Sequence, residues 1–292
     1  MFVIIGILVV FGAIIGGYTM EHGQLLVLVQ PAELLIIGGA ALGAVLISNP
    51  VPTLKRMAAG LAGVFGGDVR TKDFYMENLK MLNDLFMAAR KNGVAKLEAD
   101  VDDPGKSPVF TKYPKFLKNH HAVAFVCDTL RMFISGGVDP FELDQMMELD
   151  MEVHHAEMIE PVAALSTTAD SLPGLGIVAA VLGVVITMGA LGGPPEEIGH
   201  KVAAALVGTF LGILLCYGFI GPVAARMGKA NDAEARFYHV MRQGILAFMR
   251  GSAPIMAVEF ARRAVPASVR PSFQELEKNC RHVASAPPAA AA

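Results

Sequence analysis

Small and polar side chains recur at helical spacing along two uncharged stretches of this sequence. In the stretch 172–191, and again in the stretch 202–225, they share one face of a helix. Small residues allow helices to approach closely in lipid, which fits either tight packing alone or a smooth wall beside a narrow path for water. The first face holds Pro173, Gly176, Ala180, Gly183 and Thr187, and the second holds Ala205, Thr209, Gly212 and Cys216.

Two prolines lie where these stretches approach one surface of the membrane. Pro222 falls inside the stretch 202–225, leaves the carbonyl of Gly218 without its helical donor and predicts a bend. Pro173 opens the stretch 172–191, and the first turn of a helix accepts proline readily. Both positions suit the point at which a channel would meet a cytoplasmic domain.

Signatures of enzymes are missing from the sequence. It holds no Walker A loop, no dinucleotide-binding fingerprint and no nucleophile elbow. His154 and His155, with Glu157, could suggest a metal site, but adjacent residues point to different faces of a helix. We therefore predict a protein without catalytic residues, metal or cofactor. The net charge of −3 gives no reason to expect nucleic acid.

Ionisable side chains are absent from the middle of every apolar stretch, and Glu33 lies near the edge of one of them. A pathway for protons or sodium ions usually needs an ionisable group inside the membrane. If this chain conducts ions, a partner must supply that group.

Four stretches of the chain are long enough to cross a bilayer, which takes about 20 apolar residues. The chain is 53% hydrophobic and only 17% charged, and short gaps join the stretches in pairs. We predict an all-α integral membrane protein with four transmembrane helices as two hairpins, a large helical cytoplasmic loop and a helical C-terminal tail. The expected parts are a first hairpin over 1–50 (helices at about 2–19 and 31–49), a cytoplasmic domain over 51–171, a second hairpin over 172–225 (helices at about 172–191 and 202–225), a cytoplasmic tail over 226–283 and disordered Ala/Pro residues over 284–292.

Lysine and arginine set the expected orientation. The loop 51–171 carries 13 of them and the tail from residue 226 carries 10, whereas the two hairpin turns carry only Lys201. Because basic residues stay on the cytoplasmic side, both termini are expected in the cytoplasm.

Hydrophobic spacing predicts four helical segments in the cytoplasmic parts. Asn92 and Gly93 predict the end of the first, and Gly136 and Gly137 the end of the second. The third can run directly into the membrane. The segments are Asp73–Arg90, about 117–134, a stretch that starts near Pro140, and Asp232–Phe260.

Longer stretches of the sequence resemble one family, the MotA subunits of flagellar stators, within the wider MotA/TolQ/ExbB proton-channel group. The resemblance covers nearly the whole chain. Its most specific stretches are DSLPGLGIVAAVLGVV (170–185), VGTFLGILLCYGFIGP (207–222), ISGGVDPFELDQMME (134–148) and, in the tail, APIMAVEFARRAV and RPSFQELE.

This resemblance implies a stator subunit of the bacterial cytoplasmic (inner) membrane rather than an enzyme. Such subunits form a homo-oligomeric ring, expected to be a pentamer, around a MotB-like dimer. The partner brings a proton-accepting aspartate and anchors to peptidoglycan, which would explain the uncharged spans. Ion flow changes the contacts of the ring with this partner, and the cytoplasmic loop transmits force to the rotor protein FliG. Membrane lipids are the remaining expected partners.

Several residue roles also follow from the resemblance. Arg90 and Glu98, in ARKNGVAKLE, match the family's torque pair, and Asp150 matches a further acidic position. Exposed charges suit brief, steerable contacts with opposite charges on a rotor. Pro173 and Pro222 match the two functional prolines of the family.

Two further positions concern the transported ion. Thr209 matches the family's threonine in the fourth span, where a hydroxyl could line the ion path. Sodium-driven relatives carry threonine where this chain has Ala180. A dehydrated sodium ion needs oxygen ligands, whereas a proton needs only a titrating group and water. Ala180 therefore predicts protons as the transported ion.

Three alternatives stay open: a TolQ- or ExbB-like subunit that energises envelope transport, a sodium-driven PomA-like stator, and a purely structural membrane scaffold. TolQ and ExbB relatives usually have three spans, so the intact first hairpin and the loop with Arg90 and Glu98 disfavour them. A scaffold would need neither Pro173 nor a partner carboxylate.

Overall fold

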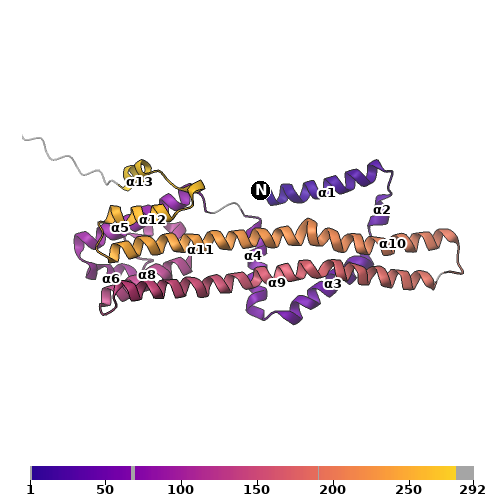
Figure 1. The fold of residues 1–292 in the computed structure, drawn as a ribbon, viewed down its shortest axis with the longest axis horizontal. Coiled ribbons are helices and arrows are strands. Elements are labelled where there is room, and N and C mark those ends of the chain that lie inside the picture. Colours follow the sequence, from indigo (N-terminus) through magenta and orange to yellow (C-terminus); the bar gives the residue numbers. More distant parts are fainter. Residues whose placement is uncertain (1, 67–69, 190, 281–292) are drawn as a thin grey trace, which may run out of the picture. The chain divides into compact units, whose positions relative to one another are not determined.

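The computed structural model describes residues 2–66, 70–189 and 191–280, and the expected Ala/Pro tail over 284–292 lies outside the described residues. Helices dominate the described part, in which no strand occurs (Figure 1). The predicted all-α class is confirmed.

Two compact units divide the chain, and α9 and α11 contribute residues to both. Unit 1 comprises Met1–Gly67 and Ala156–Asn231, and unit 2 comprises Asp68–His155 and Asp232–Ala292. The helices of unit 1 are α1 (Phe2–Met20), α2 (Leu25–Leu28), α3 (Pro31–Ser48), α4 (Val51–Val64), part of α9 (Pro140–Met188), α10 (Pro195–Ile213), the π-helix η3 (Leu214–Ile220) and part of α11 (Gly221–Met249). Unit 2 holds the rest of α9 and α11 with α5 (Lys72–Asn92), η1 (Val94–Leu97), α6 (Glu98–Asp102), η2 (Phe110–Lys112), α7 (Pro114–Leu117), α8 (His120–Ser135), α12 (Pro254–Ala264), η4 (Ala267–Val269) and α13 (Phe273–Cys280).

Four helical segments of the described chain are long and apolar enough to cross a membrane, as predicted. In the second of them α3 begins at Pro31, as predicted, and α2 extends the apolar run back to Leu25. The third and fourth extend well beyond their expected ranges, since each continues as a more polar helix. The segments are Phe2–Met20, Leu25–Ser48, Pro140–Met188 and Pro195–Met249.

Pro173 lies in the interior of α9, which is helical from Pro140 onward. A proline at this place cannot donate to the carbonyl of Ala169, four residues earlier. The helix expected to start near Pro140 does run directly into the third span, so Pro173 does not occupy a first turn.

Pro222 follows the π-helix Leu214–Ile220. Hydrogen bonds in a π-helix reach five residues back, and the N–H of Gly221 donates to the carbonyl of Cys216. A proline removes the donor that a regular α-helix would need at this place. The described chain therefore shows a widened turn just before Pro222, and the bend predicted there stays a prediction.

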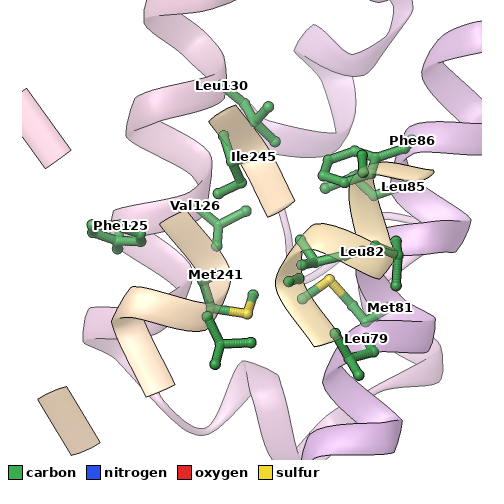
Figure 2. Close-up of a cluster of buried hydrophobic side chains, with 14 of the residues drawn as sticks. Leu79, Met81, Leu82, Leu85, Phe86, Phe125, Val126, Leu130, Met241 and Ile245 are labelled. Carbon is green, nitrogen blue, oxygen red and sulfur yellow. The ribbon is translucent and has the colours of Figure 1, made fainter. Parts of the chain in front are cut away.

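The core of unit 2 forms where α5, α8, α11 and α12 pack together (Figure 2). The side chain of Thr71 accepts a hydrogen bond from the N–H of Phe74 and caps α5, and Gly93 ends it at a φ of 87°. The helix predicted over Asp73–Arg90, and its end at Asn92 and Gly93, are confirmed. From α5, Phe86 stacks on Phe248 of α11 with ring centroids 4.3 Å apart.

The C-terminal tail breaks where one helix was predicted. α11 ends at Met249 and α12 begins at Pro254, so a continuous helix over Asp232–Phe260 is wrong. Gly251 takes a φ of 88°, a left-handed conformation that ends helices. The proline then suits the first turn of the next helix.

A buried carboxylate pairs with two arginines of its own helix, α12. Glu259 is 7% exposed and accepts hydrogen bonds from Arg262 at 2.6 and 2.7 Å and from Arg263 at 3.0 Å. Arg262 also donates to the carbonyl of Pro271 at 2.9 Å. The hydrogen bonds from Arg262, and then from Arg263, hold the pKa of Glu259 below its ordinary value.

Replacing Glu259 by Gln should lower the stability of the purified chain in detergent by about 1–3 kcal/mol at neutral pH, because the amide keeps one acceptor oxygen and removes the negative charge from all three hydrogen bonds. Since the folded-state pKa is depressed, the carboxylate stabilises the fold above the ordinary glutamate pKa and loses this effect as pH falls below it. Thermal melts followed by circular dichroism should show that the difference in melting temperature between the wild type and the variant shrinks on acidification. The exposed Asp232, changed to Asn, is the control. A gap that stays constant down to acid pH would contradict this role of the charge.

Candidate functional site

The small-residue faces of α9 and α10 meet inside unit 1. A Cβ added to Gly212 would lie 2.5 Å from the carbonyl oxygen of Leu172 and 2.9 Å from the Cα of Gly176. One added to Gly183 would lie 2.7 Å from the Cβ of Ala205. The backbones approach so closely that only glycine fits, so these residues pack one helix on the other.

The close contact of α9 and α10 through Gly176, Gly183, Ala205 and Gly212 is called the seam below. Ala180 and Thr209 are half-buried beside it. The backbone nitrogen of Ala180 would lie 3.3 Å from a Cβ added to Gly208, the residue before Thr209. The structure thus brings these two predicted ion-path positions to one level of the α9–α10 pair. Thr187 differs from them, because it is buried and its hydroxyl donates to its own helix, at the carbonyl of Gly183, 2.8 Å away.

The two prolines of the predicted ion path lie in the same unit. Pro173 is half-buried and Pro222 is exposed. Since Pro222 directly follows η3 and Gly221, it lies beside the irregular turn of the fourth span. The side chain at this place is open to contact with another chain.

A cavity of about 440 Å³ with several polar residues in its lining was not predicted from the sequence. It lies in unit 1 at the end of α3, where the hydroxyl of Thr53 donates to Glu160 at 3.1 Å. Hydroxyl and carboxyl groups of this kind can hold water. The polar residues around it are Ser48, Asn49, Thr53, Glu160, Thr167, Thr168 and Ser171.

Glu33 is a functional candidate that the sequence analysis did not assign to the ion path. It lies in the first turn of α3, near the edge of that helix as predicted, and the apolar run before it extends back to Leu25. Its side chain is 6% exposed, and its Oε2 atom is enclosed without a hydrogen-bond partner among the described residues. A Cβ added to Gly208 would lie 2.6 Å from this oxygen. An acid within a long apolar run was the signal that could have found it.

The predicted torque residues lie on the surface of unit 2. Arg90 is in the last turn of α5, Glu98 begins α6, and the short helix η1 separates them. Asp150 lies on α9. All three side chains are exposed, and none of them has an ion pair within the described part of the chain. Exposed, unpaired charges are available to a partner.

His154 contacts another histidine rather than forming a site with its neighbour His155. The rings of His154 and His121 lie 3.6 Å apart by their centroids, and that of Tyr238 lies 5.2 Å from His154. Among the described residues, His, Cys, Asp and Glu form no group of three that could hold a metal ion.

Comparison with known families identifies two matching regions. The family described as "Motility protein A N-terminal" matches residues 4–93, and the "MotA/TolQ/ExbB proton channel family" matches residues 117–238. The motility protein A of Salmonella typhimurium and that of Escherichia coli are each 40% identical to this chain over 283 residues, which cover 97% of this chain and 96% of either relative.

Two solved structures are also similar. The flagellar MotAB stator complex from Bacillus subtilis matches with a TM-score of 0.73 at 25% identity, over 91% of this chain and 96% of the solved chain. The C. jejuni MotAB structure matches with a TM-score of 0.74, over 91% of this chain and 95% of that one. At 18% identity, the second likeness shows the fold alone.

Changing Gly212 to Ala should reduce the amount of folded chain in the membrane. The added methyl group would collide with the backbone of α9, and overpacking typically costs about 1–3 kcal/mol. Gly174 lies on α9 with nothing among the described residues within 4 Å of its added Cβ, so Gly174→Ala is the matched control. Membrane abundance and thermal aggregation in detergent measure the effect. Equal values for the two variants would show that the seam tolerates a side chain.

Proposed function

This chain belongs to the motility protein A family of flagellar stator proton-channel subunits, and from that membership we propose how its two units divide the work. Unit 1 carries the ions with a MotB-like partner, and unit 2 pushes on the rotor protein FliG. The observation that carries the proposal is the 40% identity to motility protein A of E. coli over 97% of this chain. The first family match, over residues 4–93, favours it over a TolQ- or ExbB-like role.

In the proposed assembly, copies of this chain surround the membrane helices of the MotB-like partner, with five copies expected. The half-buried Ala180 and Thr209, and the exposed Pro222, are the parts of the seam region left open for that partner. The partner's carboxylate takes up protons between these helices. Pro173 and Pro222 each leave a backbone carbonyl without its helical donor. The helices can therefore bend at these places in α9 and η3.

We place both chain termini and unit 2 on the cytoplasmic side of the inner membrane. The support is the distribution of Lys and Arg, which leaves only Lys201 in the two hairpin turns. Even this residue is offset, because it forms an ion pair with Glu197 at 2.8 Å. On this topology the free charges of unit 2 can reach a cytoplasmic rotor.

Torque on FliG is proposed to pass through Arg90 and Glu98, with Asp150 as a further contact. The charges are exposed and unpaired, so a rotor face of opposite charge can bind and leave them without first breaking an ion pair within this chain. Exposed charge pairs are worth little individually, about 0.2–1 kcal/mol, which suits contacts that form and break at every step.

Protons are the proposed ion. Ala180 offers no side-chain oxygen beside Thr209, so a dehydrated sodium ion would find one oxygen ligand fewer at this level than in a relative that carries threonine there. A proton needs only water and the carboxylate of the partner.

Reversing the charge of Arg90 should impair swimming without loss of protein. A strain that lacks this chain is complemented with the wild type, with Arg90→Glu, or with Lys112→Glu, which makes the same charge change at another exposed site of unit 2. Swimming speed is tracked, with membrane abundance checked by blot. We expect wild-type speed for the Lys112 control and a severalfold loss for Arg90→Glu. If the deleted strain still swims and no second stator system accounts for it, the proposed motor function is refuted.

Swimming driven by the wild-type chain should not follow external sodium. At fixed pH, replacing sodium by potassium is expected to leave the speed unchanged, and collapsing the proton gradient is expected to stop the cells. Ala180→Thr, tested in parallel, adds the hydroxyl that Ala180 lacks. Speed of the wild type that rises and falls with sodium would overturn the choice of ion.

A further inference from the structure

Glu33 lies deep within unit 1. Its Oε2 atom faces Gly208 of α10. A Cβ added to Gly208 would lie 3.3 Å from the backbone nitrogen of Ala180 on α9. Ala180 precedes the end of α9 by roughly two turns, or about 12 Å of helix. Since the hydrocarbon core is about 30 Å thick, this level falls inside the membrane. On the proposed topology it is in the extracytoplasmic half.

Among the described residues, Oε2 of Glu33 has no hydrogen-bond donor that could offset a negative charge. A Cβ added to Gly208 would meet this oxygen and also Ala179 and Ala180, and none of these three residues carries an ionisable group. The nearest charged residues along these two helices are Asp170 and Lys201, each about two turns or more away, and Lys201 is already paired. A buried carboxylate without a donor or cation is costly, so the carboxyl rests there with its proton bound.

We propose that Glu33 is a proton-binding site of the ion path, supplied by this chain in addition to the carboxylate of the partner. The inference rests on the proposed proton-driven function. Extracytoplasmic water delivers a proton to the Glu33 carboxylate, and the carboxylic acid later gives it up toward the partner's carboxylate. Because Oε2 is enclosed against Gly208, exchange requires α3 and α10 to part at this contact. Proton transfer is thereby tied to helix movement.

Variants of Glu33 separate proton binding from packing. Gln has nearly the size and polarity of Glu but cannot bind and release a proton, whereas Asp keeps the carboxyl and leaves a gap. Proton binding therefore predicts activity in the order Glu, Asp, Gln, and a packing role predicts that Gln works better than Asp. Glu21→Gln is the matched control, since Glu21 is an exposed acid shortly before this helix.

The test uses the full chain with its partner in a strain that lacks this chain. Swimming speed, membrane abundance and acidification of the cytoplasm after an external acid shift are measured for each variant. We expect Glu33→Gln to lower proton flux about tenfold at equal abundance, less than the ~100-fold typical of a positioned proton-transfer group because water can carry part of the flow. The Asp variant should recover part of it. Normal flux and speed in Glu33→Gln would overturn the inference while leaving the motor function intact. Failure of the wild-type chain to restore swimming would instead refute the proposed function.

A second measurement uses the wild-type chain and does not depend on how variants fold. Dicyclohexylcarbodiimide is an apolar reagent that adds to protonated carboxyl groups. Treated membranes are digested, and the peptides with Glu33 and Glu21 are compared by mass spectrometry. An adduct at Glu33 that declines as pH rises, with none at Glu21, is the expected result. A Glu33 peptide that stays unmodified at every pH would show that its carboxyl does not exchange protons with the path.

Discussion

Where α9 crosses α10, the two backbones touch through glycine. Gly212 lies so close to Gly176 and to the carbonyl of Leu172 that no side chain fits between them. Lipid gives no hydrophobic force to hold helices together, so close packing of this kind supplies much of the attraction. The crossing also decides what remains exposed. Residues on the seam are enclosed, and those just beside it, such as Ala180 and Thr209, stay partly open to a further helix.

The charged residues of unit 2 serve two separate purposes. Some are paired and shielded, as where Arg242 donates to Asp144 at 2.6 Å and Glu259 accepts from Arg262. The first pair joins α11 to α9, and the second lies within α12. Others, among them Arg90 and Glu98, stand at helix ends with no partner in the described chain. A rigid core with free charges at its surface suits a domain that must bear load and still release its contact.

Much of the fold follows from the sequence because its signals are local. Apolar runs mark the spans, and Gly93 marks the end of α5, since each depends on neighbouring residues alone. The errors came from long-range or competing effects. Pro173 has the look of a first-turn residue, yet the helix before it persists because the tertiary fold supports it. Gly251 takes a left-handed conformation just after α11 ends, although the hydrophobic spacing around it is helical. The burial of Glu33 was not predicted because it depends on which helix packs opposite, and Gly208 lies far away in the sequence. The proposed torque residues came from family resemblance, because an exposed charge carries no local sign of its use.

The widened turn at η3 has a geometric consequence of its own. A π-helix holds one more residue than the α-helical turns that it replaces, and its wider turn absorbs that residue. Each residue of an α-helix advances the direction of the side chains by roughly 100°. If Leu214–Ile220 were wound as a regular α-helix with all its residues, the side chains of α11 would turn by about that angle relative to those of α10. The widened turn thus lets the fourth span carry an extra residue while a given face of α11 keeps its alignment with α10.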